Sequence, residues 1–258
     1  MPQVSLSARE QKLLRGLARR KVRASEGCFL AEGVRVVEDL LASPLRTRLL
    51  VASSTLEDSD RGAALLQTAM CAGVPVRRVE QTLFAQFAET ETPQGVLAVA
   101  EMPRADLAAL LEGNGDAVLL ALDGVQDPGN FGVLVRTAEA LGARGVIALP
   151  GTVDPWNPKA VRSAVGSSFR VPIASAEWPE LAEAARGAGF QVLASAAGGE
   201  PLGTPPGRAL LVMGNEGAGV SAEALAHADR VVGIPLRGRA ESLNVAAAAA
   251  ILLHELLR

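Results

Sequence analysis

Polar residues that could do chemistry gather in three segments of the C-terminal half, each directly after a strand-like apolar run. In the first segment, Asn130 stands at the start of a helical pattern, where it can cap the helix. Arg136 follows six residues later, inside an otherwise apolar stretch of that helix. A buried arginine there would need an anion, because an unpaired buried charge is costly. The residue therefore indicates either an anionic ligand or a salt bridge to a carboxylate of the protein.

The second segment, residues 214–221, contains three glycines and Glu216. Glycines at the end of a strand permit the close approach of another backbone or a positive φ. Residues 217–222 also match the dinucleotide pattern GxGxxA, with Glu241 following, which would suggest an oxidoreductase that uses NAD. The context disfavours that interpretation, because only one strand follows and a mononucleotide-binding half needs βαβαβ.

The third segment places Ser242 and Asn244 before a helix that carries the alanine run 246–250. Capping explains at least one of these two polar residues. The alanines have two explanations, high helix propensity and a helix face that packs closely against another backbone. Arg237 and Arg239 lie in the loop before this helix.

These segments need a scaffold that brings them together. Residues 116–258 alternate between apolar strands and helices, which predicts a parallel sheet covered on both faces. Such sheets bind ligands at the carboxyl ends of their strands, where all three segments lie. Residues 1–101 predict a second, smaller α/β domain that begins with a helix over 7–21. Residues 102–115 are expected to form the linker.

The charge of the chain is unevenly distributed. The net charge of −3 argues by itself against a nucleic-acid partner, yet residues 9–23 contain seven basic residues and one acidic residue. Such a cluster can neutralise phosphates, although a run of charge is more commonly a solvated helix face. Two isolated cysteines and two histidines without metal spacing indicate neither a zinc site nor a disulfide framework. We therefore expect a cytoplasmic protein with no metal ion and no membrane segment.

Taken together and in this order, the three segments resemble the SpoU (TrmH-like) family of RNA ribose 2'-O-methyltransferases, and most of all its ribosomal-RNA branch. The matching segments are NFGVLVRTAEALGA (130–143), LLVMGNEGAGVS (210–221) and IPLRGRAESLNVAAAAAILLHEL (234–256). The resemblance covers residues 117–258 well. It extends to the N-terminal half through FLAEGVRVVEDLL and TPQGVLAVA, which look like the family's accessory substrate-binding domain.

The resemblance implies a C-terminal sheet domain with a deep trefoil knot, a homodimer, and S-adenosyl-L-methionine as the cofactor. It also implies that the alanine helix packs under the cofactor and against the partner subunit. Carried over by motif, the backbone groups that bind the adenine end of the cofactor belong to Gly214, Ile234 and Leu243. The catalytic positions are Arg136, Asn130, Glu216, Ser242 and Asn244.

The resemblance gives Arg136 the central role, either as the general base or as a cation that grips the adjacent phosphate and stabilises the developing alkoxide. A free guanidinium has a pKa above about 12, which favours the cationic role. A non-catalytic RNA-binding factor of the same fold is the alternative, which the intact polar positions disfavour. The chain departs from its relatives at Ala164, where they commonly have serine, so a substrate contact by that serine is in doubt.

An RNA substrate, ribosomal RNA in preference to tRNA, also gives the basic cluster a purpose. The chain has few aromatic residues and no tyrosine, so backbone and shape recognition should dominate over base stacking. The residues expected to bind RNA phosphates are Arg15, Arg19, Arg20, Lys21 and Arg23.

Overall fold

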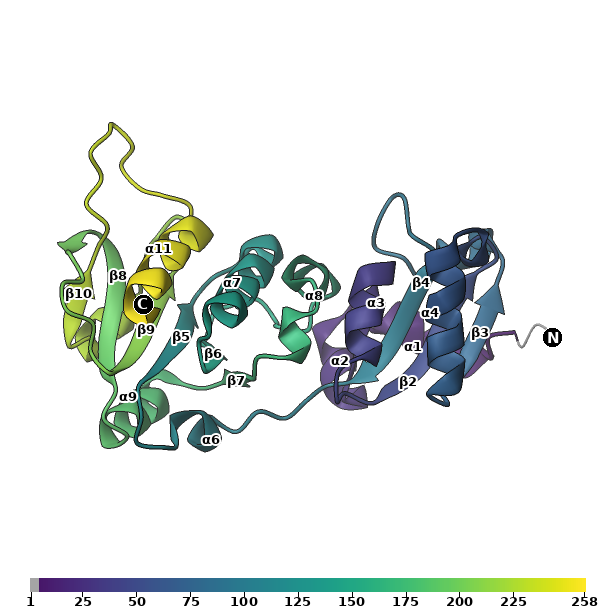
Figure 1. Cartoon of the computed structure of the whole chain (residues 1–258), viewed down its shortest axis with the longest axis horizontal. Helices are drawn as coiled ribbons and strands as arrows, with labels where there is room; N and C mark the ends of the chain where they lie inside the picture. The colour runs from purple at the N-terminus through teal and green to yellow at the C-terminus, as the bar shows by residue number, and fades with distance from the viewer. Residues whose placement is uncertain (1–4) are drawn as a thin grey trace. The chain divides into compact units, whose positions relative to one another are not determined.

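The computed structural model describes residues 5–258, which divide into two compact units (Figure 1). The first unit contains the described residues up to Pro103 together with the later segment Trp156–Phe169. The second unit contains Arg104–Pro155 and Arg170–Arg258. The sequence predicted domain boundaries at residues 101 and 116. It did not predict that Trp156–Phe169, a segment of the C-terminal half, packs with the N-terminal unit.

A four-stranded sheet with the order β1-β4-β2-β3 forms the first unit. Strands β1 and β2 pair antiparallel with β4, whereas β3 runs parallel to β2. The strands are β1 (Cys28–Glu32), β2 (Thr47–Ser53), β3 (Val76–Val79) and β4 (Val96–Glu101). The helices are α1 (Ala8–Gly16), α2 (Arg20–Glu26), α3 (Val34–Leu41), α4 (Asp60–Cys71), α5 (Gln81–Phe84) and α8 (Pro158–Ala164), with 3-10 turns η1 (Leu56–Asp58) and η2 (Ser167–Phe169).

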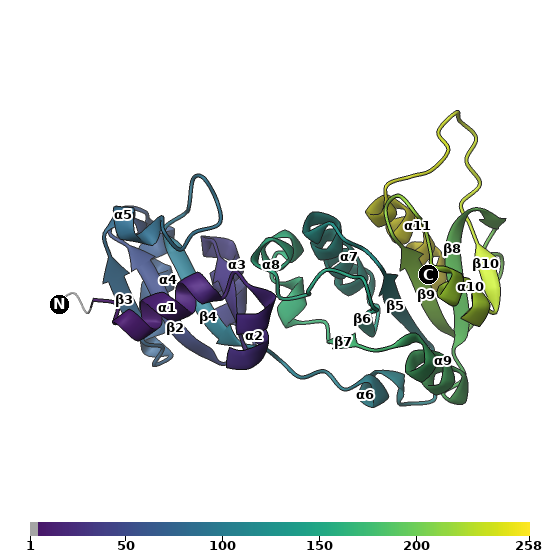
Figure 2. The ribbon, with the colours of Figure 1, turned by 180° about the vertical axis from the view of Figure 1, so that it is seen from behind.

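Helices cover both faces of this sheet. Along β1, Phe29 and Ala31 join a buried cluster with α3 and α4, whereas Cys28 and Leu30 join a second cluster with α1 and α5. Figure 1 shows α3 and α4 on one side of the sheet, and Figure 2 shows α1 and α5 on the other. Burial on both faces explains why β1 and β4 are continuous apolar runs with little polar alternation.

Aromatic packing attaches the segment Trp156–Phe169 to the first unit. The Phe29 ring centroid lies 4.7 Å from that of Trp156 and 5.7 Å from that of Phe169. Arg162, on α8, approaches the buried carboxylate of Glu32 at 3.6 Å.

The end of α8 has an unusual backbone. Val165 has a φ of 46°, a left-handed conformation that a β-branched residue rarely adopts. Gly166 follows with a φ of 78°, and a Cβ at this position would collide with the Asp39 side chain. The segment that departs from the family pattern at Ala164 is therefore also locally strained.

The sequence prediction of one helix over 7–21 is wrong. The chain forms α1, breaks at residues 17–19 and starts α2. Arg19 is extended, with a φ of −98° and a ψ of 129°. Gly16 leaves space for α2 to fold back, since a Cβ there would lie 2.9 Å from Val22 Cγ1. Tertiary packing has overridden a pattern that is periodic across the break.

A six-stranded sheet with the order β10-β8-β9-β5-β6-β7 forms the second unit, and all its strand pairs are parallel, as predicted. The strands are β5 (Ala117–Asp123), β6 (Gly145–Ala148), β7 (Ile173–Ser175), β8 (Gln191–Glu200), β9 (Arg208–Gly214) and β10 (Arg230–Val232). The helices are α6 (Leu107–Leu111), α7 (Pro128–Leu141), α9 (Trp178–Gly187), α10 (Ala222–His227) and α11 (Val245–Leu257).

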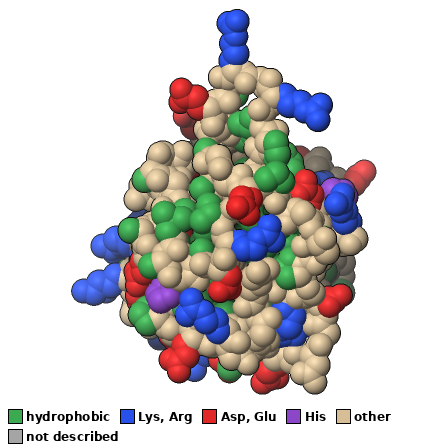
Figure 3. Space-filling model, turned by 90° about the vertical axis from the view of Figure 1, so that its left-hand side faces the viewer, with side chains coloured by type: hydrophobic (Ala, Val, Ile, Leu, Met, Phe, Trp, Pro, Cys, Tyr) green, Lys and Arg blue, Asp and Glu red, His purple; other side chains and the backbone are tan. Residues whose placement is uncertain are grey.

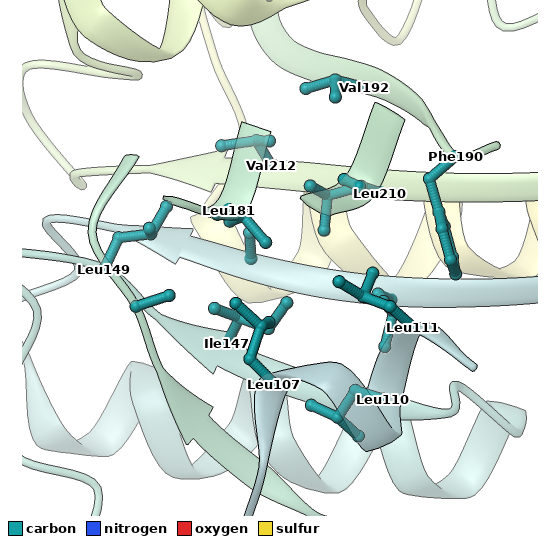
Figure 4. Packing of buried hydrophobic residues seen from close by; sticks show 14 of the residues in the cluster. Leu107, Leu110, Leu111, Ile147, Leu149, Leu181, Phe190, Val192, Leu210 and Val212 are labelled. Atoms are coloured by element: carbon teal, nitrogen blue, oxygen red, sulfur yellow. The ribbon is translucent and has the colours of Figure 1, made fainter. Parts of the chain in front are cut away.

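Helices α7 and α11 lie side by side on one face of this sheet (Figure 1). The other face is covered by α6, α9 and α10. Figure 4 shows its core, where Leu107 and Leu181 pack near Ile147 and Leu210 of the sheet. Within residues 5–258, none of the helices is long and apolar enough to cross a membrane.

Two glycines allow separate segments of the second unit to touch through their backbones. A Cβ on Gly199 would lie 2.5 Å from the Val232 carbonyl carbon, and one on Gly233 would lie 2.7 Å from the Ala196 oxygen. The Gly233 N–H donates to the Glu200 carbonyl at 2.8 Å. The loop that follows β10 is thus held directly against the end of β8.

Candidate active site

The three polar segments lie in loops that follow β5, β9 and β10 of the parallel sheet. Strands β5 and β9 are neighbours, and their last residues, Asp123 and Gly214, are register partners. The loops at 124–127 and 215–221 therefore leave the sheet from the same edge. This edge is the carboxyl end of a parallel sheet, where such folds bind ligands.

Asn215 shapes the glycine-rich loop. Its backbone N–H and carbonyl both bond to Gly219, at 2.8 and 3.0 Å. Its side-chain oxygen accepts from the N–H groups of Gly217 and Ala218 at 2.9 Å, and its amide donates to the Gly124 carbonyl at 2.9 Å. A Cβ on Gly214 would clash with the backbone of Gly219. The GxGxxA stretch is consequently a closed turn around Asn215, which does not support the dinucleotide interpretation.

Glu216 connects this turn to the loop after β5. Its carboxylate accepts from the backbone N–H of Asp127 at 3.1 Å, the N–H of Gln126 at 3.3 Å and the Asn130 amide at 3.1 Å. Partial burial alone would raise the pKa of Glu216, but these hydrogen bonds, with one from its own backbone, lower that pKa below the ordinary value. The side chain is therefore an ionised acceptor at neutral pH.

Asn130 and Asn244 extend the connection to the last helix. The Asn244 Nδ2 group donates to Asn130 Oδ1 at 3.2 Å. Asn244 Oδ1 accepts from the N–H groups of Ala246 at 2.9 Å and Ala247 at 3.4 Å, so Asn244 is the N-cap of α11. A continuous series of hydrogen bonds thus runs from Glu216 through Asn130 to Asn244.

The capping prediction for Asn130 is wrong, because the helix begins earlier than its sequence pattern suggests. Asp127 is the N-cap of α7 and accepts from the Asn130 N–H at 2.8 Å, while Pro128 takes the first helical position. The Asn130 side chain is thereby released from capping and bonds to Glu216 and Asn244 instead.

Arg136 is exposed on α7, and among residues 5–258 its guanidinium has no hydrogen-bond or ion-pair partner. The salt bridge considered from the sequence is therefore not formed within the described chain. Ser242 is exposed two residues before Asn244. The structure places both side chains on segments joined by the Asn130–Asn244 hydrogen bond, and leaves both available to a substrate.

The positions expected to bind the cofactor lie at the ends of the same strands. Gly214 ends β9, and Ile234 follows β10 by two residues. Leu243, next to the N-cap Asn244 of α11, is 38% exposed. Backbone groups at strand ends and an uncovered leucine suit a ligand that combines a polar ring edge with apolar surface.

Asp123 supports the site and was missed from the sequence. Asp123 is buried, accepts from the Trp178 indole N–H at 3.2 Å, and accepts from the Ser221 N–H at 2.6 Å. It therefore fixes the far end of the glycine-rich loop, as Asn215 fixes its near end. The sequence did contain a signal for Asp123, because it is the acidic last residue of the otherwise apolar strand β5.

The basic cluster of the first unit divides in two. Arg19, Arg20 and Lys21 are exposed, and within residues 5–258 their side chains have no hydrogen-bond or ion-pair partner. Arg15 is exposed as well, but its guanidinium donates to Gln86 at 3.1 Å and lies 5.3 Å from the centroid of a phenylalanine ring.

Arg23 corrects the expectation for this cluster. It is only 2% exposed, and its guanidinium donates to the carbonyls of Leu17 at 2.7 Å and Ala18 at 2.9 Å. These carbonyls follow the end of α1, so Arg23 stabilises the break between α1 and α2. A side chain buried in this way is not available to RNA phosphates.

Within residues 5–258, no group of three or more His, Cys, Asp or Glu side chains is placed to hold a metal ion.

Two family models match the chain. The model of the SpoU rRNA Methylase family matches residues 117–254, and the model of the MRM3-like substrate binding domain matches residues 10–98.

Curated relatives match over nearly the whole chain. A 23S rRNA (guanosine(2553)-2'-O)-methyltransferase, RlmP, from Bacillus subtilis is 38% identical, with 97% of each chain covered. A 23S rRNA (uridine(2479)-2'-O)-methyltransferase from Streptomyces viridochromogenes is 33% identical, over 98% of this chain and 91% of the relative.

Solved structures also match over nearly the whole chain. The SpoU methyltransferase AviRb from Streptomyces viridochromogenes, in complex with AdoMet, has a TM-score of 0.84 at 32% identity, with 98% of this chain and 97% of that chain covered. An AdoMet-bound rRNA methyltransferase from Sinorhizobium meliloti has a TM-score of 0.84 at 32% identity, with 98% and 95% covered.

Proposed function

The chain belongs to the SpoU rRNA methylase family, and we propose that it transfers a methyl group from S-adenosyl-L-methionine to a ribose 2'-hydroxyl of ribosomal RNA. One observation carries the proposal. The hydrogen bonds from Glu216 through Asn130 to Asn244 join all three motif segments in one place, while Arg136, on the same helix as Asn130, has no partner within residues 5–258. A solvent-exposed guanidinium on the helix that also carries Asn130 is available to bind an anionic substrate.

The cofactor supplies an electrophilic methyl group on a sulfonium and a neutral thioether as leaving group. The positions that would hold its adenosyl part are Gly214, Ile234 and Leu243. Gly214 is buried and lacks room for a side chain, so only its backbone can meet a ligand. Structures of two relatives with AdoMet bound support the choice of cofactor.

Arg136 binds the phosphate next to the target ribose and stabilises negative charge that develops on the 2'-oxygen. In the reaction the O–CH3 bond forms, the S–CH3 bond breaks, and the hydroxyl proton leaves to phosphate or water. A guanidinium is a poor base but a strong donor with a planar fork, which suits this cationic role. Positioning the hydroxyl in line with the methyl group can supply much of the rate enhancement.

The remaining polar residues hold the reacting groups in place. Glu216 is ionised and fixes the Asn130 amide, which in turn orients Asn244 through its oxygen. Ser242 lies two residues before Asn244 and is free to donate a hydrogen bond to the ribose or the cofactor carboxylate. Each loop is thus held by its neighbours, and a small displacement at one would misalign the substrate.

The N-terminal unit binds the RNA outside the target nucleotide. This role is supported by the match to a substrate-binding domain and by Arg19, Arg20 and Lys21, whose side chains have no partner within residues 5–258. A ribosomal RNA substrate also supports a cytoplasmic location.

A second copy of the chain covers the outer face of α7 and α11. Val133 on α7 is 43% exposed, and Ile251 on α11 is 37% exposed. Ala247, one turn before Ile251, is exposed on the same helix face. Exposed apolar side chains on two adjacent helices suit a homodimer interface. Replacing Val133 and Ile251 with glutamate should convert dimers to monomers in light scattering, whereas an unchanged mass would contradict the interface.

The function is tested by methyl transfer from labelled S-adenosylmethionine to unmodified 23S rRNA transcripts. A 2'-O-methyl group protects its phosphodiester from alkaline cleavage, so the label should survive in an alkali-resistant dinucleotide. Binding of RNA and of S-adenosylhomocysteine without any methyl transfer would instead favour the non-catalytic alternative. Mapping 2'-O-methyl positions in a strain without the gene would identify the nucleotide.

A further inference from the structure

The loop at 233–244, between β10 and α11, is fixed at both ends and exposed between them. Its first residue, Gly233, is bonded to Glu200, and its last residue, Asn244, caps α11 and bonds to Asn130. Residues 235–243 are all exposed. Figure 1 shows the loop projecting from the second unit, and Figure 3 shows basic side chains that extend from it at the top of the view.

Arg237 and Arg239 are the basic residues of this loop, and among residues 5–258 neither guanidinium has a hydrogen-bond or ion-pair partner. Three other arginines of the same unit are used internally. Arg144 donates to the Glu112 carbonyl, Arg208 donates to three carbonyls at 111–115, and Arg230 donates to the Leu202 carbonyl at 2.9 Å. The two loop arginines are thus distinct from those that stabilise the fold.

The loop also holds its arginines close to the catalytic residues in the chain. Arg239 precedes Ser242 by three residues and Asn244 by five. Because Asn244 is bonded to Asn130, two turns before Arg136 on α7, the base of the loop is anchored at the reacting centre. A long loop without secondary structure in a compact domain is commonly a binding element.

We propose that Arg237 and Arg239 bind backbone phosphates of the substrate RNA that flank the target ribose. The proposal rests on the proposed function and adds to it a second contact region, separate in sequence from the basic cluster of the N-terminal unit. A guanidinium fork matches the geometry of two phosphate oxygens, so each arginine can bind one phosphate in a bidentate manner. Such contacts fix the register of the RNA without reading its sequence.

The test is a double variant, Arg237→Gln with Arg239→Gln, in the full chain. Affinity for an unmodified 23S rRNA fragment is measured at several salt concentrations. The slope of log affinity against log salt should become shallower by about 0.7–0.9 for each lost phosphate contact. The KM for RNA should rise on the order of tenfold with a smaller change in kcat, because the contacts exist before and during the reaction. Affinity for S-adenosylhomocysteine should not change.

A matched control removes the same charge elsewhere in the same unit. Arg104 and Arg258 are exposed, and within the described chain neither has a side-chain partner. Arg258 follows the far end of α11, roughly 20 Å along the helix from Asn244. Arg104→Gln with Arg258→Gln should keep the wild-type slope and KM. Arg237→Lys with Arg239→Lys should keep most of the slope, because lysine retains the charge.

Three results would overturn the proposal. A wild-type slope in the double glutamine variant would mean that the loop arginines release no phosphate counterions. Loss of the dimer in light scattering would mean that the loop contacts a second copy of the chain. A weaker affinity for S-adenosylhomocysteine would assign the loop to the cofactor. If wild-type protein transfers no methyl group while the slopes still differ, the proposed function fails and the RNA contact stands.

Discussion

The Asn244 amide donates to Asn130 Oδ1 at 3.2 Å, across 114 positions of sequence. The same asparagine caps α11, and its partner also bonds to Glu216. An asparagine presents one acceptor and two donors in a fixed plane, so both amides are oriented by the residues on either side. The geometry of the site therefore depends on the last helix as much as on the strand-end loops.

Arg136→Ala should abolish methyl transfer while it leaves the melting temperature and the affinity for S-adenosylhomocysteine close to wild type. The reason is that Arg136 is exposed and stabilises no other described residue. Arg136→Lys distinguishes the two mechanisms, because lysine keeps the charge but loses the planar fork. Partial activity of the lysine variant would support the cationic role. Near-normal turnover by the alanine variant would remove Arg136 from the mechanism.

The alanine helix offers a matched pair of positions. Ala249 is fully buried and Ala247 is exposed on α11. Ala249→Leu should overpack the contact of α11 with α7 and the sheet, and should lower the free energy of unfolding by about 1–3 kcal/mol. Both changes are made in the Val133→Glu, Ile251→Glu background, which removes the proposed dimer, and there Ala247→Leu should not lower it. Chemical denaturation of both variants checks this, and equal stability would leave helix propensity as the explanation of the alanine run.

Acid should weaken the fold partly through Glu216. The folded-state pKa of this carboxyl is lowered, so its hydrogen bonds stabilise the protein above the unfolded value of about 4.3. That stabilisation is lost as the pH falls below this value through the folded pKa. Glu216→Gln should therefore destabilise the protein at pH 7 and flatten the dependence of the unfolding free energy on pH below about 4.3. Parallel curves for wild type and variant would show that the carboxylate contributes nothing.

The basic cluster predicts different outcomes for neighbouring residues. Changing Arg19, Arg20 and Lys21 together to glutamine should reduce the affinity for RNA. The slope of log affinity against log salt concentration should become shallower by about 0.7–0.9 for each lost phosphate contact. The stability of the protein should not change. Arg23→Gln should instead lower the melting temperature, because its buried guanidinium bonds to two carbonyls after α1. RNA titrations and thermal unfolding of the two proteins separate these roles. A merely solvated face would leave the slope of the triple variant unchanged.

Val165→Asn should stabilise the first unit by about 0.5–1 kcal/mol, because asparagine tolerates the left-handed backbone that valine adopts here. Val165→Ala is the control, since it shortens the side chain without that tolerance. The two free energies of unfolding can be compared by denaturant titration. A less stable asparagine variant would show that the valine side chain contributes more than its backbone strain costs.

Much of the fold could be predicted from the sequence, because buried strands and amphipathic helices carry strong patterns. The parallel sheet is confirmed by the structure, and the knotted SpoU fold by its solved relatives. The break between α1 and α2 could not be predicted, since it depends on Gly16 meeting Val22 and on the buried Arg23. The place of Trp156–Phe169 depends on aromatic contacts to Phe29 in the other half of the chain.

Only part of the candidate site could be predicted from the sequence. Residue types and their order indicate which loops matter, because polar residues follow strands that meet at one sheet edge. The hydrogen bond between Asn130 and Asn244 joins distant segments, and no local pattern reports it. Asp123 was missed for the same reason, since its partners Trp178 and Ser221 become neighbours only when the sheet forms.

The close contact between Gly199 and Gly233 has a consequence for how such proteins diversify. With Gly233 fixed against β8 and Asn244 fixed at α11, a change in the length of the loop between them cannot shift the sheet or the helix. Insertions and deletions there would be absorbed outward into solvent, where loops tolerate them. Related enzymes could therefore acquire new RNA targets by altering the exposed middle of this loop, residues 235–241, while the site residues near its two fixed ends keep their places.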